Sequence, residues 1–300
     1  MRIRRVMRNI YSRLLELVRL YLAFYHHKAV TIMVVIGCCT SFQVCPLRKT
    51  TTYSTSMAET KSLLFPDGVE LTLNAKTEVV LKEASDHRTA ELVHGEIHAR
   101  VIHGMSLPLN VVIGKALIQD LGTEFDVASH DDVITVAVTA GRVRVMEQQA
   151  DGTAANPFDM TSAKPDRGPT YLVSGDMARL EVQDGVVFLR NERHDLADAV
   201  GRSAWMTGEM RAKNERLDEL LWQLNAYHSV QIRVADPAIA ESKIGGIYSL
   251  KSASEFLKAV ELALNLETVP VKDPNTGEVT TYILRMPVTK DDHARPNRHK

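Results

Sequence analysis

A chain of 300 residues is long enough for about two domains. Its 45% hydrophobic and 24% charged residues describe an ordinary folded protein and exclude a disordered chain. The formal net charge of −1 gives no basic excess and argues against nucleic acid as a partner. All three cysteines, Cys38, Cys39 and Cys45, lie near the amino end. The rest of the chain can therefore hold neither a disulfide framework nor a cysteine-based zinc site.

The amino-terminal residues predict a membrane anchor. Residues 1–28 carry seven Lys and Arg side chains against one acid, Glu16, and residues 29–44 carry no charge. A cationic flank before an apolar run is typical of a helix that crosses a membrane with its amino end in the cytoplasm. We expect a short basic cytoplasmic segment over residues 1–28 and one transmembrane helix over residues 29–47.

Other interpretations of this segment stay open. The uncharged run is shorter than the roughly 20 residues that span hydrocarbon, so a helix here would need tilt or local thinning of the bilayer. A cleaved signal peptide is one alternative, and a lipoprotein signal is another, because Val35-Ile36-Gly37 precedes Cys38. Residues 7–24 have apolar positions at helical spacing between arginines. That helix would either lie on anionic lipid or dock a cytoplasmic partner.

After a Thr- and Ser-rich linker over residues 48–62, the sequence predicts an all-β sandwich or β-roll. From Leu63 to residue 190, short segments of alternating apolar and polar residues recur, separated by turn signals such as Pro66-Asp67-Gly68. Residues 150–169 contain three prolines and predict a long exposed loop.

The stretch from Leu121 to Val145 is the clearest part of this β-pattern. Phe125 and Val127 are predicted to face the core, and Ile134, Val136 and Val138 alternate with the residues between them. Gly141 is predicted to reverse the chain into an antiparallel hairpin. No catalytic group is evident in the stretch, so we interpret it as a scaffold.

A change of periodicity marks a second domain. After a linker over residues 191–208, four leucines from Leu217 to Leu224 form one helical stripe, with Asn214 as the expected N-cap. Ser252 and Glu255 have the spacing of a capping box at the start of a second helix. Strand, helix and strand occur twice, which predicts a small α+β domain over residues 209–286, with a disordered tail over 287–300.

Histidines and carboxylates offer a weaker, enzymatic interpretation. His94, His98 and His103 are close in sequence, but in a strand we expect them to face solvent and not to share a metal. Asp67, Glu96 and Asp126 include a possible carboxylate pair for glycoside hydrolysis, although turn and surface positions account for them. The sequence has no nucleophile elbow, phosphate loop or dinucleotide fingerprint. We therefore expect no enzymatic activity, no cofactor and no metal.

Several motifs together resemble the FecR family of membrane-anchored regulators. In the β-region they are FPDGVELTLNAKTEV, ELVHGEIHARV, DLGTEFDV, VTAGRVRV and YLVSGDMARL. In the second domain they are LDELLWQLNAYHSVQIRVADP, IGGIYSL and EFLKAVELAL. The resemblance runs from about Leu63 to Leu266 and depends on the order of many weak motifs. The positions that carry it are Asp67, Gly68, Leu121, Gly122, Thr123, Phe125, Gly141, Arg142, Trp205, Gly208, Leu224 and Asn225.

The resemblance implies a signalling function at the bacterial inner membrane. FecR-like proteins cross that membrane once and hold both folded domains in the periplasm. Their carboxy-terminal domain contacts the signalling domain of a TonB-dependent outer-membrane receptor, commonly one for ferric siderophores. Their cytoplasmic segment binds an extracytoplasmic-function sigma factor, and proteolysis relays the signal. This chain departs from the family in a shorter segment before the predicted span, without Trp, and in Ala212, where an aromatic is usual.

The expected contact surface is the strand that contains Ile244, Gly245, Gly246, Ile247 and Tyr248. An exposed strand edge can accept a strand from another chain, and paired glycines allow close backbone approach. The alternative is that the glycines only make a bulge or a turn. An alternative function is a membrane-anchored or lipid-anchored periplasmic adaptor, or a glycan-binding protein, without a sigma factor.

Overall fold

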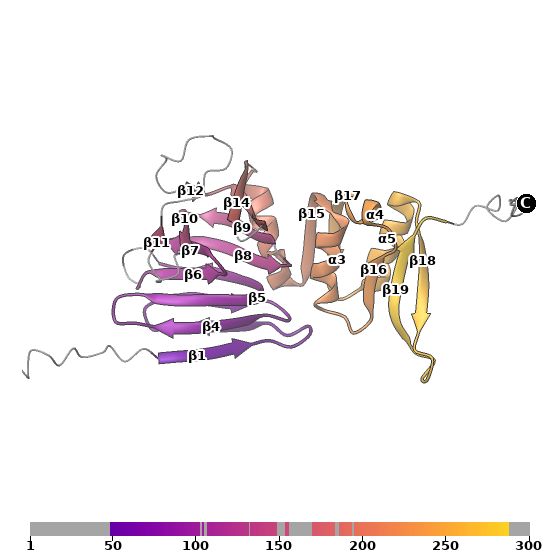
Figure 1. Ribbon diagram of the computed structural model, residues 1–300, viewed down its shortest axis with the longest axis horizontal. Coiled ribbons are helices and arrows are strands. Elements are labelled where there is room, and N and C mark those ends of the chain that lie inside the picture. The colour runs from indigo at the N-terminus through magenta and orange to yellow at the C-terminus, as the bar shows by residue number, and fades with distance from the viewer. Residues whose placement is uncertain are drawn as a thin grey trace, which may run out of the picture. The chain divides into compact units, whose positions relative to one another are not determined.

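The structure of the chain is a computed structural model (Figure 1). It describes residues 49–102, 104, 107–131, 133–148, 154–155, 170–183, 186–193 and 195–287. The predicted leader, membrane helix and lipid-attachment cysteine lie outside these residues, as does nearly all of the predicted tail. Within the described part of the chain, no helix has the length and apolar character needed to cross a membrane. The described residues belong to one compact unit, in which two separate apolar cores mark two domains.

The first domain, called the β-domain below, consists of two sheets. The first sheet has the order β1–β4–β5–β6–β7–β10, and both β11 and β12 pair with β10. In this sheet β5 and β6 run parallel and the other neighbours run antiparallel. Its strands are β1 (Lys49–Ser54), β4 (Glu78–Glu83), β5 (Arg88–Arg100), β6 (Leu109–Ile113), β7 (Ala116–Asp120), β10 (Arg142–Gln148), β11 (Ala154–Ala155) and β12 (Thr170–Val173).

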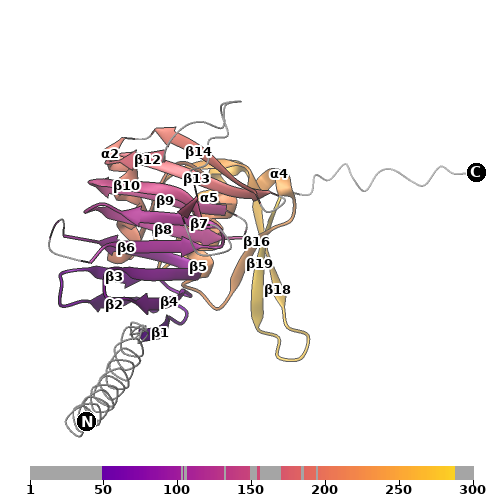
Figure 2. The ribbon, with the colours of Figure 1, turned by 60° about the vertical axis from the view of Figure 1, so that its left-hand side comes forward.

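The second sheet is antiparallel and has the order β2–β3–β5–β8–β9–β13–β14. It shares β5 with the first sheet. The first half of this long strand pairs with β4 and β6, and its second half pairs with β3 and β8. Figure 2 shows the strands of the β-domain stacked side by side. The remaining strands are β2 (Lys61–Leu64), β3 (Glu70–Leu73), β8 (Glu124–His130), β9 (Val133–Ala140), β13 (Asp176–Gln183) and β14 (Val186–Arg193).

Alternating apolar residues of both sheets fill the core of the β-domain. The predicted core residues are all buried there, with exposed fractions of 0–3%, and they are Phe125, Val127, Ile134, Val136 and Val138. Fully burying such a side chain contributes roughly 1.5–3 kcal/mol. The sequence prediction of a β-rich domain is therefore confirmed for the described strands.

The predicted hairpin at Gly141 is wrong in its pairing. Strand β9 pairs with β8 and β13, whereas β10 pairs with β7, β11 and β12. Gly141 thus carries the chain from one sheet to the other. The alternation of apolar residues is the same on either side of a hairpin or of a corner between sheets, so the pattern could not separate the two. A second corner follows β12, and the Ser174 amide there donates to the Gly141 carbonyl at 3.1 Å.

Two segments predicted as linkers belong to the fold. Residues 48–62 contain β1 and the start of β2, which pair with β4 and β3 respectively. The threonines of β1 suit an edge strand with little burial, so the apolar alternation was absent. Residues 191–208 contain the end of β14, the helix α2 (Leu196–Arg202) and the 3₁₀-helix η1 (Ser203–Thr207). Asp195 caps α2 by accepting a hydrogen bond from the Asp198 amide.

The carboxy-terminal domain has the predicted order of elements but places its strands in two sheets. Strands β15 and β17 pair antiparallel, and β19 lies between a parallel β16 and an antiparallel β18. Figure 2 shows β18 and β19 as a long hairpin, coloured yellow. The elements are β15 (Glu209–Arg216), α3 (Leu217–Asn225), β16 (Gln231–Val234), α4 (Pro237–Ala240), β17 (Lys243–Ser249), α5 (Ala253–Leu264), β18 (Glu267–Lys272) and β19 (Val279–Arg285).

Helices α3 and α5 cover a second core in this domain. All four leucines of the predicted stripe, from Leu217 to Leu224, are buried. Ser252 caps α5 as predicted, because its hydroxyl accepts a hydrogen bond from the Glu255 amide. Asn214 is not the cap of α3. It lies in β15 at a positive φ of 64°, in a bulge where the pairing with β17 shifts, and α3 begins three residues later.

Candidate functional site

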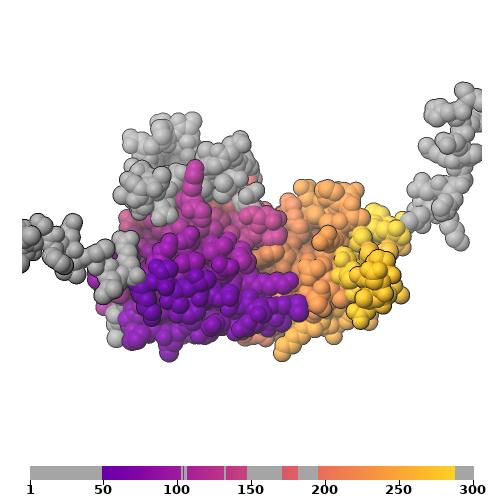
Figure 3. All heavy atoms as spheres, turned by 60° about the horizontal axis from the view of Figure 1, so that its bottom comes forward, coloured from indigo at the N-terminus to yellow at the C-terminus, as the bar shows by residue number. Residues whose placement is uncertain are grey.

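The carboxy-terminal domain packs against the outer face of the second sheet of the β-domain, and the interface is largely polar. Figure 3 shows the two domains, orange to yellow and indigo to magenta, in direct contact. The Ala58 amide donates to the Ala226 carbonyl at 3.1 Å, and Lys76 Nζ donates to the Asn225 carbonyl at 2.9 Å. The ring of His130 stacks on Trp222 at 4.9 Å between centroids. Interfaces of this polar character resemble transient contacts between proteins more than they resemble a core.

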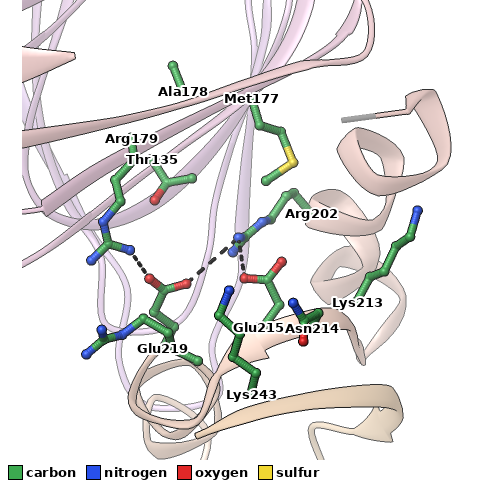
Figure 4. A pocket seen from close by; sticks show the side chains of 11 residues that line it. Thr135, Met177, Ala178, Arg179, Arg202, Lys213, Asn214, Glu215, Glu219 and Lys243 are labelled. Atoms are coloured by element: carbon green, nitrogen blue, oxygen red, sulfur yellow. Dashed lines mark hydrogen bonds and ion pairs between the residues drawn. The ribbon is translucent and has the colours of Figure 1, made fainter. Parts of the chain in front are cut away.

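A cavity of about 180 Å³ lies within this interface (Figure 4). Arg179 of β13 pairs with Glu219 of α3, and Arg202 Nη2 of α2 lies 2.9 Å from Glu215 Oε2 and 3.9 Å from Glu219 Oε2. Lys213 points away from this network toward Asp195 and Asp198. Because carboxylates already hold these cations, we interpret the cavity wall as an ion-pair network that joins the two domains.

A second polar cluster beside it is buried. Asn74, Glu96, His98 and Asp126 lie on the outer face of the second sheet, yet none is more than 4% exposed. On β5, Glu96 and His98 point to this face because Ile97 and Ala99 point into the core.

The carboxy-terminal half of the chain covers this cluster. The hydroxyl of Ser203 in η1 donates to Asp126, and Tyr227 donates to Asn74, whose amide donates to Glu96 at 2.7 Å. His98 Nδ1 lies 3.2 Å from Asp126 Oδ2. We call Glu96, His98 and Asp126 the interface cluster.

The electrostatics of the interface cluster favour bound protons. Burial, together with the charge of Asp126, raises the pKa of Glu96 to about 8. Burial lowers the pKa of His98, but the hydrogen bond and charge of Asp126 outweigh it, so the pKa lies above its ordinary value. Burial and the charge of Glu96 also raise the pKa of Tyr227. A carboxyl group that is neutral near pH 7 thus lies between the domains.

The sequence prediction for this cluster was wrong. His94 is exposed, as expected, but His98 is buried, and neither Glu96 nor Asp126 is a surface residue. The alternation correctly placed them on the face away from the core, but no local signal shows that another domain covers that face. His103 lies outside the described residues. Among those that are described, no group of three or more His, Cys, Asp or Glu side chains is arranged to hold a metal ion.

The motif residues of the β-domain lie at turns and at the corner between sheets. Asp67 accepts hydrogen bonds from the Leu107 amide and from Arg88, which lower its pKa although burial opposes them. Arg88 in turn stacks on the Phe65 ring at 3.9 Å. Gly68 has a positive φ of 86° in the same turn.

Leu121, Gly122 and Thr123 form the turn before Phe125, where both the Gly122 amide and the Thr123 hydroxyl donate to Asp120. Gly141 packs on this turn, because a Cβ there would lie 2.4 Å from the Gly122 carbonyl. Arg142 lies over the Tyr171 ring at 4.8 Å. Two of the FecR-like motifs, DLGTEFDV and VTAGRVRV, therefore build one corner of the β-domain.

The motif residues of the carboxy-terminal domain are structural as well. Trp205 and Leu224 belong to its core, and Gly208 ends η1 at a positive φ of 79°. The Asn225 side chain donates to the Ile232 carbonyl at 2.9 Å and accepts from the Ile232 amide at 2.8 Å. It thereby ties the end of α3 to β16.

The predicted contact strand, β17, forms an edge of the β15–β17 sheet in the described part of the chain. Ile244 is buried in the core, and Tyr248 packs edge-on against Phe256. Gly245 lies opposite the bulge in β15, and the Tyr248 hydroxyl covers Gly246, which has a φ of +150°. Ile247 is 65% exposed. Of the five predicted residues, Ile247 is thus the one whose side chain is free to meet a partner.

The backbone of β17 also faces outward at Ile247. The Leu250 amide donates to the Gly208 carbonyl, so residues 250, 248 and 246 direct their amides and carbonyls at β15. Ile247 lies between two of these positions and directs its amide and carbonyl away from β15. An added strand could pair with it there.

Comparisons with known proteins support the resemblance of the β-domain to FecR proteins. Residues 51–144, from within β1 to within β10, match the family model described as FecR protein. A crystal structure of a proposed anti-sigma factor from Parabacteroides distasonis ATCC 8503 superposes with a TM-score of 0.62 and 21% identity, covering 79% of this chain and 100% of that one. A second crystal structure of such a protein from the same organism gives 0.60 and 21%, covering 80% and 100%. No curated protein matches the sequence. The structures establish a shared fold.

Proposed function

Because residues 51–144 are a FecR domain, we propose that this chain regulates a sigma factor. The match to the family model carries the proposal. The structural neighbours support it, because both are described as proposed anti-sigma factors and their fold extends over about four fifths of this chain. The site also fits a regulator: its described features are an edge strand and a domain interface, both of which are suited to contacts between proteins.

The signal, in this proposal, comes from the signalling domain of a TonB-dependent outer-membrane receptor. The exposed edge of β17 supports this, because it offers a backbone amide and carbonyl at Ile247 to a strand from another protein. The arrangement requires a chain that crosses the inner membrane once near its amino end, with both described domains in the periplasm. The uncharged run of residues 29–44 after a basic segment supports that topology. The chain acts without enzymatic activity.

The test is to delete the gene in its own host and to measure transcripts that depend on each extracytoplasmic-function sigma factor. We expect one such set of transcripts to change at least several-fold and to return to its starting level when the chain is supplied again. A variant without residues 1–28 should fail to restore it, because this segment would meet the sigma factor. Transcript sets that stay unchanged on deletion would favour a periplasmic adaptor or glycan-binding protein instead.

A further inference from the structure

The interface cluster contains more carboxyl groups than its surroundings can neutralise. Five titratable or charged groups act on Glu96 and His98, in addition to the effect that these two residues have on each other. They are Glu70 of β3, Glu124 and Asp126 of β8, Arg202 of α2 and Tyr227 after α3.

The positive charge of Arg202 acts on Glu96, but its guanidinium is already paired with Glu215 and Glu219. With Glu96 and Asp126 ionised and His98 protonated, the cluster would bury one uncompensated negative charge. Burying such a charge is costly, and a group in this position takes up a proton instead.

One acceptor atom of the cluster also has no hydrogen-bond donor. Asp126 Oδ2 receives Ser203 and His98, but Asp126 Oδ1 is buried and has no partner among the described residues. An unpaired buried acceptor costs about 1–3 kcal/mol. One added proton would remove the excess negative charge of the cluster.

The carboxy-terminal half of the chain contributes to the burial of these groups. The sheet holds Glu96, His98 and Asp126 on its outer face, and Ser203, Arg202 and Tyr227 cover them from the other half of the chain. If the carboxy-terminal domain moved away, water would solvate the carboxylates and the need for the proton would end. Docking is thus coupled to proton uptake.

We propose that the interface cluster is a proton-operated latch, which strengthens the docking of the carboxy-terminal domain on the β-domain as pH falls. This holds whether or not the chain regulates a sigma factor.

The sign and the range follow from Glu96. Its ordinary pKa of 4.5 applies when it is exposed, and its pKa when docked is about 8. A group whose pKa is raised in the docked state stabilises that state fully below the lower value, and the contribution is lost as pH rises toward the higher one. Between these values, one coupled proton weakens docking by up to about tenfold for each pH unit. His98, whose pKa is also raised, acts in the same direction.

One neighbouring group acts in the opposite direction. Burial lowers the pKa of His130, which stacks on Trp222 across the same interface, so its protonation opposes docking at low pH. The effect is confined to the region below its ordinary value of 6.5. Measurements between pH 6.5 and 9 therefore leave out the opposing effect of His130 and report Glu96 together with His98.

The experiment measures quenching of tryptophan fluorescence by acrylamide in the full chain over this range. The chain has two tryptophans. Trp205 is buried in the core of its own domain, so a change in quenching reports Trp222 at the interface. We expect quenching of the wild type to increase several-fold from pH 6.5 to 8 and to level off above it.

Two glutamine variants decide the outcome. Glu96→Gln keeps the acceptor for Asn74 and adds a donor, so its quenching should stay below that of the wild type and should change much less between pH 6.5 and 9, with only the contribution of His98 remaining. Glu91→Gln, on the same strand but exposed and paired with Lys82, should follow the wild type. Quenching of the wild type that does not vary with pH would overturn the latch, and so would a Glu96→Gln variant that keeps the wild-type dependence.

Discussion

At the scale of single residues, the role of a polar side chain depends on which part of the chain surrounds it. Glu96 and His98 occupy positions that alternation assigns to the wet face of a sheet, and the second domain makes that face dry. Asp67 instead lies in a turn of the β-domain, where the Leu107 amide and Arg88 stabilise its ionised form. Glu96 and His98 lie between the two domains, so their substitutions should be tested by an assay of domain docking. Asp67 holds a turn within one domain, so its substitution should be tested by the free energy of unfolding.

Gly141 gives the sharpest prediction at this scale. Its φ of +78° is costly for any residue with a Cβ, by roughly 1–2 kcal/mol, and the Cβ would also lie 2.4 Å from the Gly122 carbonyl. Gly114 has a φ of +54° with open space around it. In urea unfolding, Gly114→Ala should lose about 1 kcal/mol and Gly141→Ala at least about 2 kcal/mol more. Equal losses would show that the corner tolerates a side chain.

At the scale of elements, the sequence predicted the strands and helices whose apolar residues follow a regular period. The alternating valines around Phe125 and the leucine stripe of α3 were assigned correctly, because each buries one face of its own element. The strand β1 and the helix α2 were missed. Strand β1 is an edge strand rich in threonine, and α2 has only seven residues, of which Ala199 alone is buried.

Pairing was less predictable than the elements themselves. Whether the chain turns at Gly141 into a hairpin or into the other sheet depends on partners far along the chain, which a local pattern does not contain. The docking of the second domain on Glu96, His98 and Asp126 is non-local for the same reason. The sequence suggested that β17 is an edge strand but could not show which of its backbone groups face outward. The structure shows that Ile247 directs its amide and carbonyl away from β15.

The edge of β17 can be tested without removing its core contacts. Ile247→Pro removes an amide that makes no bond to β15, so the free energy of unfolding should change by less than about 1 kcal/mol. If the proposed function is right, binding of the full chain to the signalling domain of a TonB-dependent receptor from the same host should weaken at least tenfold, as measured by calorimetry. Ile247→Ala keeps the amide and should bind within a few-fold of the wild type. Equal weakening by both variants would indicate a side-chain contact, and no weakening would place the receptor elsewhere.

At the scale of the whole molecule, polar contacts decide whether the two domains behave as one unit. Each domain has its own apolar core, and what joins them is mainly hydrogen bonds, ion pairs and one stacked ring pair. Such an interface can open without exposing either core. A regulator that receives a contact on one domain and must pass it to the other can use this property.

Reversing one charge in the ion-pair network should therefore separate the unfolding of the two domains. The Glu219 carboxylate forms an ion pair with Arg179 of the β-domain, and its Oε2 lies 3.9 Å from Arg202 Nη2. Glu219→Lys would therefore place three cations together in a part-buried site. Removing one partner of a fully buried pair costs about 3–5 kcal/mol. This part-buried pair should lose less, and the loss falls on the interface and not on either core. In scanning calorimetry, the wild type should unfold in one transition and the variant in two.

Glu267→Lys makes the same change in an exposed pair with Arg285 and should keep one transition. A single transition for Glu219→Lys would mean that the domains are held together by contacts other than this network.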